Sequence, residues 1–122
     1  MYTAVVLSQA SQTKLLNALK QVIPADWKII CHHMTINMGN AQSGPAKELL
    51  GQNVQLRAIS LGKSDKAMAV TVDTNIPSAN AIKHITLAVN IKNGGKPMMS
   101  NQITDWHPMS PIDLDGVVQE CN

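Results

Sequence analysis

The chain has very few aromatic residues: no Phe, one Tyr and two Trp among 122 residues. Proteins that hold long single-stranded nucleic acids stack successive bases on aromatic side chains, so this composition excludes a long track of that kind. The formal net charge of +2 is also far below that of a protein that binds a duplex along its length. A short anionic ligand, such as a nucleotide end, is compatible with both numbers.

Cysteine and long apolar stretches are equally scarce. Cys31 and Cys121 have neither metal-binding nor redox spacing, and no disulfide framework is implied. No stretch reaches the length of a membrane-spanning helix, and the apolar run at residues 2–7 is too short for a signal peptide. We therefore expect a cytoplasmic protein without membrane contact, and the sequence indicates no obligate protein partner.

The chain does contain enough apolar material for one core. Hydrophobic residues make up 44% of the sequence and charged residues 15%, as in an ordinary globular protein. A chain of this length forms one domain, which we place at residues 1–122. Seven Met residues take the place of the missing aromatics, and we expect them to fill irregular gaps in the core.

Local patterns predict a mixed order of strands and short helices. Apolar and β-branched runs predict strands at residues 2–7, 27–38, 53–61, 67–73, 83–91 and 112–118. A helix is expected from Ser11, as its N-cap, to Pro24, and shorter helices at 45–50 and 98–106. Gly116 suggests a bulge in the last strand. Hairpins with few helices favour an α+β fold over a parallel doubly wound sheet.

Two of the expected strands carry the tripeptide His-x-Thr. Successive side chains of a strand point to opposite faces, so His33 and Thr35 share one polar face that is backed by an aliphatic one. His84 and Thr86 share a face of the later strand in the same way. We therefore expect two strands that each present a histidine and a hydroxyl on the same side.

Two histidines and two hydroxyls suit the cleavage of a phosphodiester. The reaction needs a base that takes a proton from water and an acid that protonates the leaving oxygen, and the ordinary pKa of histidine suits both tasks near neutral pH. A threonine hydroxyl can donate a hydrogen bond to a phosphate oxygen. The pattern predicts His33 and His84 as catalytic residues and Thr35 and Thr86 as phosphate-binding residues. It leaves open which histidine is the base.

The segments CHHMTIN at 31–37 and KHITLAV at 83–89 resemble the paired motifs of the two-histidine (2H) phosphoesterase superfamily. That superfamily includes the LigT-type RNA cyclic phosphodiesterases and the cyclic phosphodiesterase domains of tRNA ligases. The stretch GGKP at 94–97, with Ser100 and Asn101, is also similar to the small "Swiss army knife" RNA-repair branch.

This resemblance implies a bilobal, pseudo-two-fold α+β fold with antiparallel strands around a central cleft and a few helices outside. It implies hydrolysis of 2′,3′-cyclic phosphate ends of RNA or nucleotides without a metal or cofactor. A second substrate class within the same chemistry is the cyclic oligonucleotide defence signals that some phage members degrade. A non-catalytic module that binds nucleotides or RNA is the alternative outside the enzymes. We take Asn37, Asn90 and Lys96 as further candidate substrate contacts.

The same residues also allow roles other than catalysis. The motif histidines could be structural strand residues, and we expect His32, on the Met/Ile side of its strand, in the core. Cys31, His33, His84 and His107 lack the local spacing of known structural metal sites. Cys31 could act as a nucleophile only if its neighbour His33 lowered the pKa of the thiol.

Overall fold

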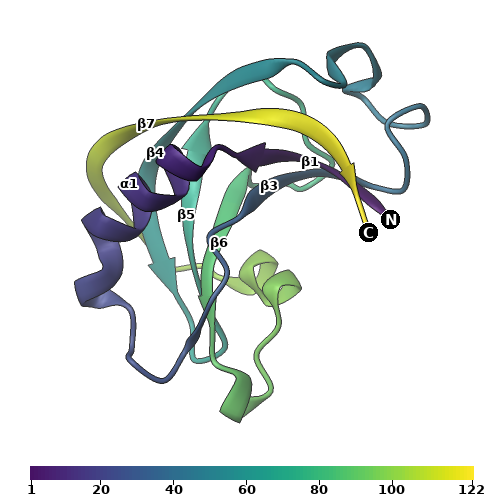
Figure 1. Ribbon diagram of the computed structural model, residues 1–122. Coiled ribbons are helices and arrows are strands. Elements are labelled where there is room, and N and C mark those ends of the chain that lie inside the picture. The colour runs from purple at the N-terminus through teal and green to yellow at the C-terminus, as the bar shows by residue number, and fades with distance from the viewer.

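Seven antiparallel strands and one α-helix make up most of the computed structural model, which describes residues 1–122 (Figure 1). In chain order the elements are β1 (Tyr2–Leu7), α1 (Gln9–Leu19), η1 (Lys20–Val22), β2 (Lys28–Ile29), β3 (His33–Met38), η2 (Lys47–Leu49), β4 (Asn53–Lys63), β5 (Ala67–Asp73), β6 (His84–Val89), η3 (Ile91–Asn93), η4 (Pro97–Gln102) and β7 (Trp106–Cys121), where η denotes a 3-10 helix.

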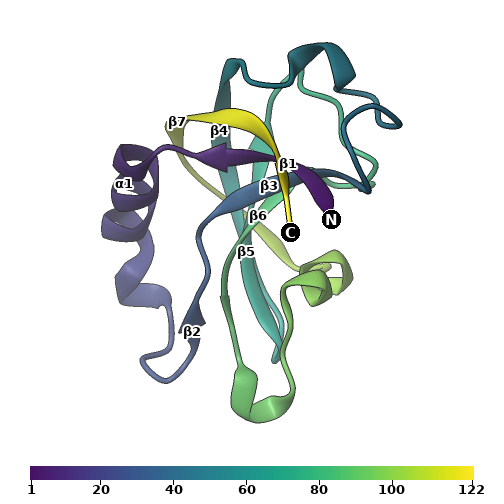
Figure 2. The same cartoon turned by 45° about the vertical axis from the view of Figure 1, so that its right-hand side comes forward.

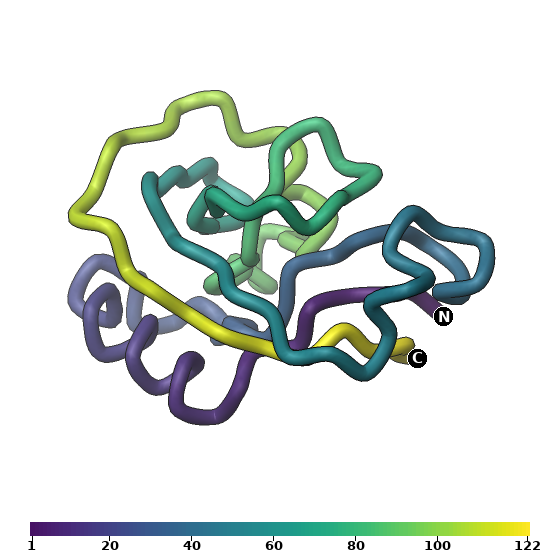
Figure 3. The backbone as a smooth tube through the Cα atoms, turned by 90° about the horizontal axis from the view of Figure 1, so that it is seen from above, coloured from purple at the N-terminus to yellow at the C-terminus, as the bar shows by residue number.

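The strands close into a barrel. Their order is β2-β6-β3-β1-β7-β4-β5, and β6 also pairs with β5, so six strands form a ring to which the two residues of β2 are added. Every pairing is antiparallel. The prediction of an α+β fold built on antiparallel strands is therefore confirmed. The strands expected in two lobes share one continuous sheet, with the two chain ends side by side (Figures 1 and 3).

The core follows from the alternation of the strands. A cluster of 19 buried residues includes Met34 and Ile36 of β3, Ile85 and Leu87 of β6, and Leu15 of α1. Met34 and Met68 are almost completely buried, as expected of methionines that fill a core without phenylalanine. Met38 and Met98, in contrast, are 77% and 70% exposed.

Helix α1 begins three residues earlier than the sequence predicted. Its N-cap is Ser8, whose hydroxyl accepts a hydrogen bond from the backbone N–H of Ser11. Ser11 is buried, and its hydroxyl donates to the Asp115 carboxylate at 2.9 Å, as does the Ser8 hydroxyl at 2.7 Å. A hydrogen bond from Asn53, together with those from Ser8 and Ser11, lowers the pKa of Asp115 to about 2. The two serine bonds fasten the helix to β7.

The expected long strand at residues 27–38 is interrupted. Cys31 has a left-handed backbone with a φ of 42°, which divides the segment into β2 and β3. The pairing with β6 shifts across this break: Ile29 lies opposite Ala88, whereas Met34 lies opposite Ile85. A step of five residues along the first segment thus corresponds to a step of three along β6, so the side-chain alternation from 27 to 38 is not continuous.

The C-terminal third also differs from the prediction. The expected helix at 98–106 is a 3-10 helix, η4, that ends at Gln102, and Trp106 already begins the 16-residue strand β7. Gly116 produces no bulge: it keeps regular register with both Leu7 and Val54. A Cβ at this glycine would lie 2.5 Å from the Val6 carbonyl oxygen, so the close approach of two backbones requires the glycine.

Helix α1 and η4 lie on opposite sides of the β3–β6 pair (Figure 2). No helix in the chain combines the length and the apolar character needed to cross a membrane.

Candidate active site

The two His-x-Thr motifs lie on neighbouring strands. Met34 of β3 is paired with Ile85 of β6, and both side chains are fully buried. The residues on either side of this pair therefore point to the other face of the sheet. His33 and Thr35 are half-buried on that face, and His84 and Thr86 are each 8% exposed.

All four motif side chains line one cleft of about 500 Å³, which we call the histidine cleft. The expectation that the four residues meet across two strands is thus matched by their placement. The rest of the lining includes Tyr2 of β1, Asn80 of the loop before β6 and Met98 of η4, so five separate parts of the chain enclose the site.

His84 is held in one orientation by the backbone. Its Nδ1 lies 2.8 Å from the carbonyl oxygen of Ile82, which can only accept a hydrogen bond. The Nδ1 atom therefore carries a proton in both the neutral and the charged ring, and Nε2 is the atom that can gain or lose one. A second group that fixes the tautomer in this way is typical of histidines that transfer protons.

His33 is kept neutral by its surroundings. Partial burial, together with the neighbouring His32 and His84, lowers its pKa from 6.5 to about 4. Its Nδ1 lies 3.1 Å from Nδ1 of His32, so one of these two atoms donates a hydrogen bond to the other. The ring of Tyr2 lies 5.0 Å from the His33 ring, centroid to centroid, and covers it on another side. At neutral pH, His33 is therefore in the form that accepts a proton.

His32 and Cys31 do not lie where the sequence predicted. His32 was expected in the core but is exposed, and Cys31 was expected on the face of His33 but is 1% exposed within the core. The cause is the left-handed backbone at Cys31, which breaks the alternation before the first motif. Burial raises the pKa of the Cys31 thiol to about 11, which is unsuited to a nucleophile.

The two threonines differ in their surroundings. Thr86 Oγ1 lies 2.8 Å from the hydroxyl of Ser100 and 3.3 Å from the carbonyl oxygen of Pro97, both on η4. At Thr35 it is the backbone carbonyl, not the hydroxyl, that accepts a bond from Ser78. The second half of the site is thus tied to η4 and the first half is more open.

Of the three candidate substrate contacts, only one lies in the histidine cleft. Asn37 lines the histidine cleft, but its Nδ2 donates to the carbonyl oxygens of Met38 and Asn40, which fixes the adjoining loop. Asn90 follows the end of β6 and donates to the carbonyl of Asp65, outside the cleft. Lys96 precedes η4 and is not part of the lining.

Sequence patterns did not indicate Tyr2, Asn80, Met98 or Ser100 as parts of the site. Tyr2 reaches it because β1 pairs with β3, opposite Met38, and the others come from loops and η4. These contacts depend on pairing between strands and on the packing of η4 against β5 and β6. The only signal for Ser100 lay in the stretch that resembles the RNA-repair branch.

The described chain has no group of three or more His, Cys, Asp and Glu side chains suited to a metal ion. Of the four residues weighed as ligands, His107 is exposed on β7, where it lies 3.1 Å from the carboxylate of Asp105. Cys31 is buried in the core cluster.

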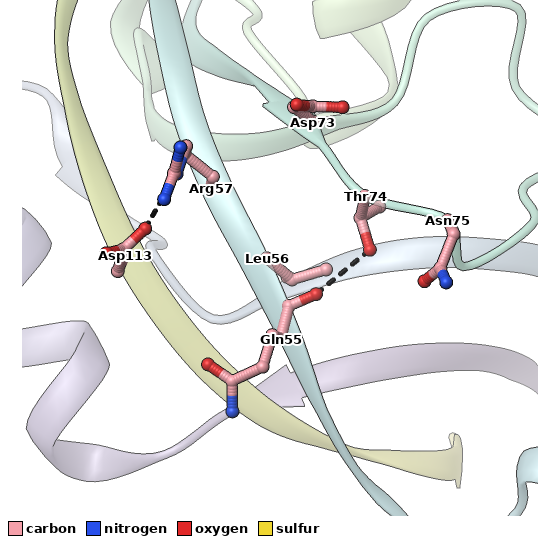
Figure 4. A pocket seen from close by; sticks show the side chains of 7 residues that line it. All are labelled: Gln55, Leu56, Arg57, Asp73, Thr74, Asn75 and Asp113. Carbon is pink, nitrogen blue, oxygen red and sulfur yellow. Dashed lines mark hydrogen bonds and ion pairs between the residues drawn. The ribbon is translucent and has the colours of Figure 1, made fainter.

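A second depression of about 450 Å³ lies over β4, β5 and β7 (Figure 4). Its main feature is the ion pair between Arg57 and Asp113, at 2.8 Å, and a bond from the Thr74 hydroxyl to the Gln55 carbonyl. It contains no histidine or cysteine. Of the two depressions, only the histidine cleft therefore contains side chains suited to proton transfer near neutral pH.

Comparisons with known proteins gave no matching family model, no matching curated protein and no matching solved structure. The residues of the histidine cleft are therefore the basis for a proposed function.

Proposed function

We propose that the chain is a phosphodiesterase that hydrolyses 2′,3′-cyclic phosphate ends of RNA or nucleotides by histidine acid–base catalysis. One observation carries the proposal: two His-x-Thr motifs from distant parts of the sequence lie on paired strands and line a single cleft. The same proposal includes membership of the 2H phosphoesterase superfamily and a cytoplasmic location, which suits two free thiols.

The finer fold assignment belongs to this proposal. The motif strands β3 and β6 are neighbours, with β1 beyond β3 and β5 beyond β6. Each motif strand therefore has one outer partner, which supports a pseudo-two-fold arrangement of two similar halves around the cleft.

His33 is the base in the proposed reaction. Because its pKa is about 4, it is neutral at physiological pH and can take a proton from water. The water oxygen then forms a bond to phosphorus, and the bond from phosphorus to one ribose oxygen breaks. His84, whose Nδ1–H is held by the Ile82 carbonyl, donates a proton from Nε2 to the leaving oxygen. The product is a phosphomonoester, and proton exchange with solvent restores both histidines.

Thr35 and Thr86 bind the phosphate in this scheme. They lie on the same face of the β3–β6 pair as the histidines, and their hydroxyls can donate to the two oxygens that do not react. Hydrogen bonds from neutral donors to a charged oxygen are stronger than bonds between neutral groups, so these contacts favour the transition state as charge builds up.

The test is a hydrolysis assay of the purified protein on 2′,3′-cyclic mononucleotides, RNA with a cyclic phosphate end, and cyclic di- and trinucleotides. We expect hydrolysis of the first two substrates, retained in excess EDTA and absent from the His33→Ala/His84→Ala double variant. Cleavage of the cyclic oligonucleotides alone would favour the defence-signal class. Binding of nucleotides without turnover would favour the non-catalytic module, and activity that EDTA abolishes and zinc restores would contradict the mechanism.

A further inference from the structure

Ser100 is a buried hydroxyl in contact with the phosphate-binding half of the proposed site. It is 1% exposed and lies in η4, which packs against β5 and β6. Ile103, next to the end of η4, belongs to a small apolar cluster with Ala67, Ala69 and Val89 of those strands. This packing fixes η4, and with it the position of Ser100 relative to Thr86.

The direction of the Ser100–Thr86 hydrogen bond follows from the available acceptors. Thr86 Oγ1 has two neighbours: the Ser100 hydroxyl at 2.8 Å and the Pro97 carbonyl oxygen at 3.3 Å. The Pro97 oxygen can only accept, so Thr86 donates to it. Ser100 has Thr86 as its side-chain partner and is shielded from water, so its own proton is satisfied only if it donates to Thr86.

With Ser100 as the donor and Thr86 as the acceptor of their hydrogen bond, the Thr86 proton remains available for a ligand. A bond of 3.3 Å is long, whereas a phosphate oxygen is charged and accepts more strongly than a carbonyl. A phosphate in the cleft can therefore take the proton from the Pro97 oxygen. Ser100 meanwhile occupies a lone pair of Thr86 and polarises its O–H bond, which strengthens the donated bond.

We propose that Ser100 is a positioning residue that holds Thr86 as a hydrogen-bond donor to a non-reacting phosphate oxygen of the substrate. The inference depends on the proposed function for the identity of the ligand. Its geometric part, a serine that acts through Thr86, can be tested by binding as well as by turnover.

The test is a double-mutant cycle with Ser100→Ala, Thr86→Val and the two combined. Two quantities are measured for each: kcat/KM on a 2′,3′-cyclic mononucleotide, and the Kd of a nucleoside 2′-monophosphate by calorimetry. We expect Ser100→Ala alone to reduce kcat/KM about fivefold, the scale of one neutral hydrogen bond, and Thr86→Val about tenfold or more. In the Thr86→Val background, Ser100→Ala should change kcat/KM less than about twofold.

Thr35→Val provides the matched control, because the Ser100 hydroxyl bonds to Thr86 and Thr35 lies on the other motif strand. In that background the full fivefold effect of Ser100→Ala should persist. Equal effects of Ser100→Ala in all three backgrounds, or no effect in any, would overturn the proposal, because a serine that only supports the fold gives additive losses.

An alternative variant and a second readout distinguish a failure of this proposal from a failure of the proposed function. If Ser100→Ala does not fold, Ser100→Cys fills the same space with a somewhat larger sulfur atom and a much weaker donor, and replaces it in the cycle. If the wild-type protein hydrolyses none of the substrates, the proposed function is wrong. The double-mutant cycle is then evaluated from the Kd values of the monophosphate alone. Coupling in Kd would still support the role of Ser100, whereas additive changes in Kd, or no binding of the monophosphate at all, would overturn it.

Discussion

The lowered pKa of His33 makes stability depend on pH in a defined window. Folded His33 takes up its proton near pH 4, whereas the unfolded chain takes it up near pH 6.5. Between these values the unfolded state binds more protons, so the free energy of unfolding decreases as the pH falls. The contribution is fully present above pH 6.5 and is lost as the pH falls toward 4.

The size of this effect follows from the shift. From 6.5 to about 4, at roughly 1.4 kcal/mol per pKa unit, the upper bound is about 3.5 kcal/mol. His33 is only half-buried, and screening by water reduces the value, so we expect about 1–2 kcal/mol. The assay is urea unfolding at pH 7.5 and pH 4 for the wild type and for His33→Asn.

The wild type should lose about 1–2 kcal/mol more than His33→Asn over this range, because the variant has no group to titrate at that position. Carboxylates that titrate in the same range are present in both proteins and cancel in the difference. His107→Asn, which removes an exposed histidine outside the cleft, is the control. Equal pH dependence in the wild type and His33→Asn would refute the lowered pKa and, with it, the assignment of His33 as the base.

Three further outcomes are expected. Thr35→Val and Thr86→Val should each reduce kcat/KM by a factor worth about 1–3 kcal/mol. The melting temperature should be kept in Thr35→Val and lowered in Thr86→Val, where the buried Ser100 hydroxyl loses its acceptor. Full activity in both variants would mean that these threonines only support the strands. His33→Ala should lower turnover about a hundredfold. His32→Ala should keep the fold, because His32 is exposed. Kinetics and thermal melts in which a well-folded His32→Ala loses turnover and His33→Ala does not would contradict the proposed site. Asp115→Ala should lower the free energy of unfolding by about 1–3 kcal/mol, because the Ser8 and Ser11 hydroxyls lose their shared acceptor, and an unchanged melt would count against that role.

The alternation of side chains along a strand was enough to predict the face on which the motif residues lie, but not the positions of their neighbours. The segment from His33 to Ile36 is continuous strand, so the rule of alternate faces assigned His33 and Thr35 correctly. The rule gave wrong positions for Cys31 and His32 because the backbone is left-handed at Cys31. A non-glycine residue rarely takes that conformation, and no local pattern indicates that it does so here.

The contacts that complete the cleft could not be predicted from local patterns. They depend on contacts between distant segments: β1 pairs with β3, where Tyr2 lies beside His33, and η4 packs against β5 and β6, where Ser100 lies beside Thr86. The same limit explains Asn90, which alternation placed on the polar face although β6 ends at Val89 and the amide bonds to Asp65 instead. Strand patterns fix which side chains share a face, and pairing across the sheet decides which of them meet.

The two halves of the cleft are unequal, and the inequality agrees with their proposed roles. In the β6 half, a carbonyl holds His84 and Ser100 holds Thr86, and both motif residues are nearly buried. In the β3 half, His33 is half-buried and contacts the exposed His32. An acid that must meet the leaving oxygen benefits from a fixed ring, since misplacement of a reacting group costs rate. A base that takes its proton from water benefits from a position near solvent, and its contact with an exposed histidine offers a path by which that proton can leave after each turnover.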